Sequence, residues 1–143
     1  FRNSHAYLRA MEFAAHHPEE LQDIARSFLA QFPEPGVFIL DGEMGAGKTT
    51  FIRAICTQMG ISNASSPTFS LVNEYLTNSG MKVFHFDLYR IKSLEEALDF
   101  GFEEYIDQKA YVFIEWPEKI LPLLDTYYTI AIHVVGEGRK IVF

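Results

Sequence analysis

Gly42-Glu-Met-Gly-Ala-Gly-Lys48-Thr49 follows the apolar run Val37-Phe-Ile-Leu40 after a single aspartate. The glycine-rich stretch fits the pattern G-x-x-x-x-G-K-[ST], in which successive backbone N–H groups turn inward around phosphate oxygens. The apolar run is typical of a strand covered on both faces, and apolar residues with helical spacing continue from Phe51 to Met59. Strand, glycine loop and helix follow in the order that a phosphate-binding loop, or P-loop, requires.

This loop predicts a site for a nucleoside triphosphate and Mg²⁺. Lys48 is placed to reach the β- and γ-phosphates, the Thr49 hydroxyl to ligate Mg²⁺, and the helix that begins there to direct its positive end at the anion. The alternative, a glycine-rich turn beside an exposed lysine, is disfavoured by the strand before the loop and the helix after it. The predicted nucleotide contacts in this segment are Gly42, Glu43, Met44, Gly45, Ala46, Gly47, Lys48, Thr49 and Thr50.

Length and composition predict one domain. The 143 residues, 48% of them hydrophobic, are enough for one core and too few for two ordinary domains. Residues 1–10 show no steady period, so we expect an N-terminal extension over residues 1–12 and a single P-loop domain over residues 13–143.

Charge and apolar patterning restrict the environment of the protein. The formal net charge of -7 argues against a chain that binds nucleic acid without the help of another protein, because binding to the phosphate backbone is driven by Lys and Arg. The apolar runs are strand-sized, no secretory signal is recognisable, and the only cysteine, Cys56, lies in an apolar helical stretch. A cytoplasmic protein without a membrane helix or disulfide is therefore predicted.

The rest of the chain alternates between helical and strand patterns. A helix is expected from Pro18 to Leu29, and Ser93 with Glu96 forms a capping box for another. Further strands are expected at 71–76 and 82–88, joined as a hairpin by a turn at 78–80, at 111–115, and at 128–135 and 140–143, paired across 136–138. These elements predict an α/β fold, a three-layer P-loop NTPase domain with a mixed, parallel plus antiparallel, central sheet.

Two acidic residues end apolar strands. They are Asp87, after Val83-Phe-His-Phe86, and Glu115, after Tyr111-Val-Phe-Ile114. Ligands of open α/β sheets bind at the carboxyl ends of strands, and a P-loop NTPase needs an acid there to hold Mg²⁺. Spacing alone leaves open which acid serves the metal and which orients water, and either one can instead be a solvated or capping carboxylate.

Three further residues can each be interpreted as purely structural or as functional. Thr68 lies in Ser65-Ser-Pro-Thr-Phe69, where a segment that senses the γ-phosphate or an ordinary proline turn is expected with equal weight. Trp116 is either a packed aromatic or a border of the nucleotide site. His85 shares a strand face with Asp87, and a satisfied core histidine is the default interpretation.

The chain resembles the TsaE family, bacterial P-loop ATPases of threonylcarbamoyladenosine biosynthesis in tRNA. The resemblance spans about residues 13–143 and is most specific in the third and fourth of its blocks. The blocks are Gly42-Glu-Met-Gly-Ala-Gly-Lys-Thr-Thr50, Ser66-Pro-Thr-Phe69 with Leu71-Val-Asn-Glu-Tyr75, His85-Phe-Asp-Leu-Tyr-Arg90 and Ile114-Glu-Trp-Pro-Glu118.

The resemblance implies hydrolysis of ATP with Mg²⁺, slow without partners, in a complex with TsaB and TsaD. TsaD transfers the threonylcarbamoyl group to adenosine beside the anticodon, so this chain would meet tRNA only indirectly and would be a monomer when free. By analogy with the family, Thr49 and Glu115 hold Mg²⁺, Lys48 and Asp87 are catalytic, and Thr68 and Trp116 lie at the nucleotide.

Two departures and two alternatives remain. The segment Phe1 to Ala10 has no recognised counterpart in the family, and no role is transferred to it. Family members often carry Ser or Thr early in the first helix, near the adenine, where this chain has Leu21, so selectivity for ATP over GTP is not predicted. The first alternative is a nucleotide-dependent binding module, in which ATP orders the loop 65–69 for a partner and hydrolysis is incidental. The second is a small-molecule kinase, which is disfavoured because no arginine-rich lid segment is apparent.

Overall fold

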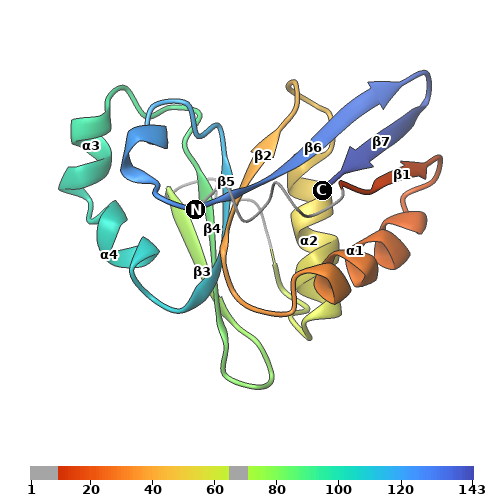
Figure 1. The fold of residues 1–143 in the computed structure, drawn as a ribbon, viewed down its shortest axis with the longest axis horizontal. Coiled ribbons are helices and arrows are strands. Elements are labelled where there is room, and N and C mark those ends of the chain that lie inside the picture. Colours follow the sequence, from red (N-terminus) through yellow and green to blue (C-terminus); the bar gives the residue numbers. More distant parts are fainter. Residues whose placement is uncertain (1–9, 65–70) are drawn as a thin grey trace.

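The computed structural model describes residues 10–64 and 71–143, built around a seven-stranded sheet (Figure 1). The strand order is β1-β7-β6-β2-β5-β4-β3. Strands β6, β2, β5 and β4 pair in parallel at the centre, and antiparallel pairs add β3 at one edge and β7 and β1 at the other. The strands are β1 (Glu12–Ala15), β2 (Val37–Asp41), β3 (Val72–Leu76), β4 (Lys82–Asp87), β5 (Ala110–Glu115), β6 (Tyr128–Val135) and β7 (Gly138–Val142). The predicted mixed sheet is confirmed.

Strand β5 shows how the sheet divides the core. All six of its residues are buried, as expected for a central parallel strand. Tyr111 and Phe113 pack into the core on one face, and Val112 and Ile114 into a second core on the other. Successive side chains of a strand point to opposite faces, so a continuous apolar run serves two layers of helices.

Helices cover both faces (Figure 1). The helices α1 (Glu20–Gln31) and α2 (Lys48–Gln58) pack together on one face. The short helices α3 (Leu94–Asp99) and α4 (Phe102–Ile106) lie on the other, followed by the 3₁₀ turn η2 (Leu121–Leu123). This is the predicted three-layer α/β arrangement. None of the helices in the described part of the chain is long and apolar enough to cross a membrane.

Aromatic packing fixes α1 and α2 against the sheet. The Phe28 ring of α1 lies 4.9 Å from Phe38 of β2, 6.4 Å from Phe51 of α2 and 5.3 Å from Phe143, measured between centroids. All four side chains are buried. A phenylalanine buried this fully typically contributes about 1.5–3 kcal/mol, so the cluster holds rigid the two elements that flank the glycine loop.

Besides the 3₁₀ turn η2, the structure adds two elements that the sequence patterns did not predict. Strand β1 pairs with β7, and Met11 exchanges backbone hydrogen bonds with Phe143, so the sheet takes in the last residues of the segment 1–12 expected as an extension. The second is the short helix α4. The predicted hairpins are confirmed, and in the predicted capping box the Ser93 hydroxyl accepts from the Glu96 amide.

Candidate nucleotide site

The glycine loop occupies residues 42–47, between the end of β2 and the start of α2. A Cβ at Gly42 would lie 2.6 Å from the Ile132 carbonyl oxygen of β6, so only glycine fits there without a shift of the backbone. Gly47 precedes α2 with a φ of 108°, a left-handed conformation that L side chains rarely adopt. The loop therefore packs against the sheet and leads directly into the N-terminus of α2.

Lys48 is the first residue of α2 and is only 5% exposed. Its Nζ donates to the Gly42 carbonyl oxygen at 2.7 Å and lies 3.5 Å from the centroid of the Trp116 ring. Burial lowers the pKa of Lys48, and nearby carboxylates, Glu115 foremost, offset that effect only in part. Its ammonium forms no salt bridge with any carboxylate of the described residues, so it is a buried cation without a direct anionic partner.

Glu115, the last residue of β5, is 3% exposed and lies beside α2. Its Oε2 accepts from Thr49 Oγ1 at 2.7 Å and lies 2.6 Å from His85 Nε2. Burial raises the pKa of Glu115, but the hydrogen bonds from His85 and Thr49, with the nearby charge of Lys48, outweigh burial and lower it overall. Glu115 is therefore held as a buried carboxylate beside the Thr49 hydroxyl.

Asp87 ends the strand next to β5. The two acids are register partners, because Asp87 of β4 lies opposite Glu115 of β5 in the parallel pair. Asp87 is only partly buried, and its Oδ1 accepts from the Tyr89 amide at 3.1 Å. The acid also contributes to the field at the Lys48 ammonium. Both predicted acids thus lie at one edge of the sheet, and they differ in their enclosure.

Trp116 has an unusual backbone conformation. Its φ of 58° is the only positive value at a non-glycine position among the described residues. An extended residue after Glu115 would face the opposite side of the sheet, whereas this turn brings the indole over Lys48. Such a conformation costs about 1–2 kcal/mol. The ring also contacts Tyr89 at 5.0 Å between centroids, so Trp116 covers Lys48, and its place at a bound nucleotide stays a prediction.

Comparisons with known proteins decide the family. The model for "Threonylcarbamoyl adenosine biosynthesis protein TsaE" matches residues 15–141. The chain belongs to the TsaE family. It is 36% identical over 126 residues to TsaE of Borreliella burgdorferi, covering 86% of this chain and 91% of that protein. Against TsaE of Bacillus subtilis the identity is 35% over 116 residues, covering 79% and 70%.

A solved structure supports the same placement. The crystal structure of YdiB from Bacillus subtilis superposes with a TM-score of 0.74 and 30% sequence identity, over 94% of this chain and 84% of that one. The predicted family and fold are confirmed. As a TsaE-family member, the protein has a role in the biosynthesis of threonylcarbamoyladenosine in tRNA.

The side chains beside the loop of this TsaE-family protein fit a magnesium ion. Mg²⁺ prefers oxygen ligands and usually binds through one or two protein groups together with phosphates and water. Thr49 and Glu115 supply a hydroxyl and a carboxylate in contact, and because the hydroxyl donates its proton to Glu115, its lone pairs are left for a metal. No group of three His, Cys, Asp or Glu suited to a metal occurs in residues 10–64 and 71–143.

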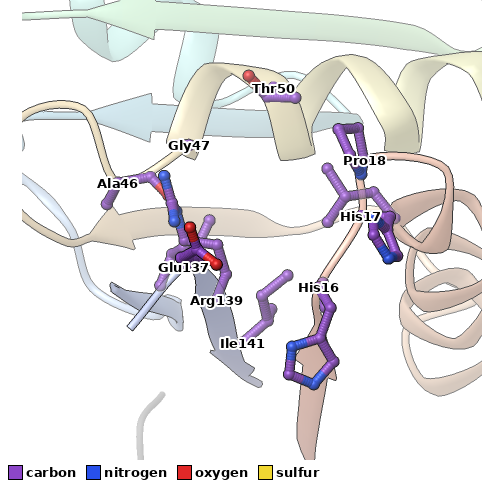
Figure 2. Close-up of a pocket in the computed structure, with 12 residues that line it drawn as sticks. His16, His17, Pro18, Ala46, Gly47, Thr50, Glu137, Arg139 and Ile141 are labelled. Atoms are coloured by element: carbon purple, nitrogen blue, oxygen red, sulfur yellow. The ribbon is translucent and has the colours of Figure 1, made fainter. Parts of the chain in front are cut away.

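A cavity of about 250 Å³ continues from the loop away from the acids. Figure 2 shows Thr50, Ala46 and Gly47 along one side of it and His16, His17 and Pro18, in the segment that leads into α1, along the other. Leu21 also lines the cavity.

Other predicted nucleotide contacts lie away from this cavity. The side chains of Glu43 and Met44 are exposed on the outer part of the loop. Thr68 lies outside the described residues.

Two residues of the site were missed or undervalued in the sequence. Arg139 of β7 donates from Nε to the Ala46 carbonyl oxygen at 2.7 Å and so supports the loop from a strand 93 residues away. No local signal marks that contact. His85 was expected to be a satisfied core histidine facing the same way as Asp87. It is buried and satisfied, but its partner is Glu115.

Proposed function

We propose that this TsaE-family protein binds ATP with Mg²⁺ in the loop 42–49 and hydrolyses it to support the threonylcarbamoyl modification of tRNA. The observation that carries the proposal is the Lys48 ammonium, which is buried at the N-terminus of α2 without a salt bridge in the described part of the chain. A buried charge that forms no direct ion pair is costly, and the nearby carboxylates offset the burial of Lys48 only in part. A polyphosphate would supply a direct counter-charge, and the α2 dipole would favour it further.

The residues around the loop divide the work of phosphoryl transfer to water. Lys48 and the loop amides bind the phosphates, and Thr49 with Glu115 hold the magnesium ion, which when bound neutralises charge on the phosphate oxygens. Asp87 is less enclosed, and it orients the attacking water. The cavity beyond Gly47, between Thr50 and the start of α1, takes the ribose and base.

The base end of the site motivates a second expectation. In the family, a Ser or Thr near this position lies close to the adenine, whereas Leu21 contributes an apolar wall to the cavity here. An apolar wall contacts adenine and guanine alike and offers neither a hydrogen bond. We therefore expect ATP and GTP to bind within about tenfold of one another, since one hydrogen bond is worth about 1 kcal/mol.

TsaB- and TsaD-like proteins are the proposed partners, with tRNA reached through them in the cytoplasm. The net charge of -7 supports this division, because a strongly acidic chain is poorly suited to binding phosphate backbones itself. The test is Mg²⁺-dependent phosphate release with and without both partners and tRNA. We expect slow release from the chain alone and faster release in the complex. Absence of release under every condition would refute the enzymatic part.

The alternative, a nucleotide-dependent binding module, predicts a different outcome. Asp87→Ala removes the proposed water-orienting group and leaves Lys48 and Thr49 in place. If that variant still supported repeated rounds of tRNA modification with both partners, ATP binding alone would be enough and the module would be favoured. If modification stopped after about one round per complex, hydrolysis would be part of the cycle.

A further inference from the structure

His85 lies in the middle of β4, in the layer between the sheet and α2. It is 1% exposed, and its neighbour two residues back on the same strand face, Val83, belongs to the core that includes α1 and α2. A polar ring buried this deeply must be hydrogen-bonded to be tolerated. Among the described residues its hydrogen-bond partner is Glu115.

The direction of that hydrogen bond follows from chemistry. A glutamate side chain at neutral pH is a carboxylate, which only accepts hydrogen bonds, and Glu115 Oε2 is already an acceptor for the Thr49 hydroxyl. His85 Nε2, 2.6 Å from Oε2, therefore carries the hydrogen and donates it. The same oxygen accepts from Thr49 Oγ1 at 2.7 Å.

These two bonds occupy one oxygen of the carboxylate. Each carboxylate oxygen offers about two lone-pair sites, and on Oε2 both are taken by Thr49 and His85. The lone pairs left for a metal ion, or for water bound to it, belong to Oε1. Without His85, a single hydrogen bond from a helix terminus would hold a side chain with three rotatable bonds.

We propose that His85 is a positioning residue of the nucleotide site: it fixes Glu115 through Oε2 and keeps Oε1 available to the magnesium ion that accompanies ATP. The inference rests on the proposed function and adds a residue to it. A histidine that only filled the core would affect the stability of the fold, whereas a positioning residue affects the coupling between Mg²⁺ and ATP. Partners that orient metal ligands typically change metal affinity 10- to 100-fold when removed.

Two amide variants separate these roles. In His85→Gln the side-chain amide can reach the place of Nε2 and donate to Glu115, whereas in His85→Asn it reaches only the place of Nδ1. The measurement is the ATP dissociation constant by calorimetry, first in EDTA and then over a series of Mg²⁺ concentrations. For His85→Asn, the Mg²⁺ concentration that gives half of the Mg²⁺-dependent gain in ATP affinity should rise at least about tenfold. The ATP affinity of this variant in EDTA should equal that of wild type. His85→Gln should stay within about threefold of wild type.

A second readout on the wild-type protein covers the case in which His85→Asn does not fold. With ¹⁵N-labelled histidine, the Nε2–H resonance of His85 should be present without ligand. It should then move when Mg²⁺ is added to the ATP complex, and hardly at all when ATP is added in EDTA. The inference is overturned if Mg²⁺ leaves that resonance in place, if Nε2 carries no hydrogen, or if folded His85→Asn shows the wild-type Mg²⁺ dependence.

The outcomes distinguish this inference from the proposed function. If the wild-type protein binds Mg²⁺ and ATP together and His85→Asn binds them equally well, the proposed function stands and His85 has no part in it. If the Mg²⁺ dependence of ATP affinity is weakened equally in His85→Gln and His85→Asn, His85 does not position Glu115, because a donor at the place of Nε2 would then make no difference. A wild-type protein that binds no ATP refutes both.

Discussion

Asp87 and Glu115 end neighbouring parallel strands in register, and yet their surroundings differ sharply. Glu115 is 3% exposed and accepts from two side chains, one on α2 and one on β4. Asp87 is only partly buried and accepts from the amide of Tyr89, two residues further on. The strand end places an acid at the carboxyl end of the parallel strands, and the elements packed around it decide whether that acid is fixed or left able to reach solvent.

This difference suggests a physical division of labour for the proposed reaction. A fixed, ionised oxygen donor suits a magnesium ion, which demands nearly ideal geometry. A carboxylate in contact with solvent suits an attacking water. Lys48 lies close enough to both acids for each to act on its pKa, so the three side chains form one electrostatic unit.

Removal of Lys48, the cation that both acids face, should have the largest effect. In Lys48→Ala, the two carboxylates would lie beside the phosphates with no protein cation between them. We expect ATP affinity to fall at least about 100-fold, since charge-assisted hydrogen bonds are worth about 1.5–3 kcal/mol each. Calorimetric titration is the measurement. Lys109→Ala, at an exposed lysine of the α4–β5 connection, is the control and should bind as wild type.

Asp87→Asn tests the solvent-accessible side of the comparison. The amide keeps the size of the side chain and removes its charge and basicity, so single-turnover hydrolysis should fall on the order of 100-fold or more. ATP affinity should change less than about threefold, because Asp87 is not a proposed phosphate or metal ligand. Asp99→Asn, at an exposed acid on α3, is the control. Normal turnover by Asp87→Asn would remove the proposed role of this acid.

Glu115→Gln tests the enclosed side. The neutral amide still fits between Thr49 and His85, but it is a poorer ligand for a divalent cation. We expect the Mg²⁺ concentration for half-maximal ATP affinity to rise on the order of tenfold, with little change in binding in EDTA. Glu118→Gln is a matched control, because Glu118 also raises the pKa of Lys48 and its side chain is exposed. Equal effects of the two substitutions would mean that enclosure is irrelevant.

A third carboxylate, that of Glu20, accepts hydrogen bonds but is not enclosed as Glu115 is. Substitution of Glu20 should give the smallest effect. Glu20 Oε1 accepts from the His16 and His17 amides at 2.7 and 2.8 Å, and these bonds lower the pKa of a half-exposed side chain below 4.5. A lowered carboxyl pKa stabilises the fold above pH 4.5, and that contribution is lost as the pH falls through the folded-state value.

Glu20→Gln should therefore be less stable than wild type at neutral pH, and the gap should close below pH 4.5. Urea unfolding over a pH series measures this gap. Glu19→Gln is the control, since the Glu19 carboxylate accepts no hydrogen bond in the described part of the chain. A gap for Glu20→Gln that does not depend on pH would show that the loss has another cause.

Much of the fold followed from local patterns. Strand β2, the glycine loop and α2 were predictable because apolar periodicity and glycine spacing are carried within the segment itself. Strand β1 was not, because it is a four-residue edge strand that gains its order from β7. Helix α4 has only five residues, and so short a helix depends on packing rather than on its own propensity.

The site was predictable as a set of residues but not as an arrangement. Asp87 and Glu115 follow similar apolar strands, so spacing could not tell them apart. What separates them is contact with Thr49 and His85, which lie 66 and 30 residues from Glu115 in the chain. The support of the loop by Arg139 is equally remote in sequence. The prediction for Thr68 stays a prediction.

The most direct test of the account is titration of the purified protein with ATP, with and without Mg²⁺, followed by calorimetry and by the fluorescence of Trp116, the single tryptophan. The account predicts one ATP per chain, tighter binding with Mg²⁺, and a change in fluorescence because the indole lies against Lys48. Neither heat nor a fluorescence change at millimolar ATP and Mg²⁺ would contradict it.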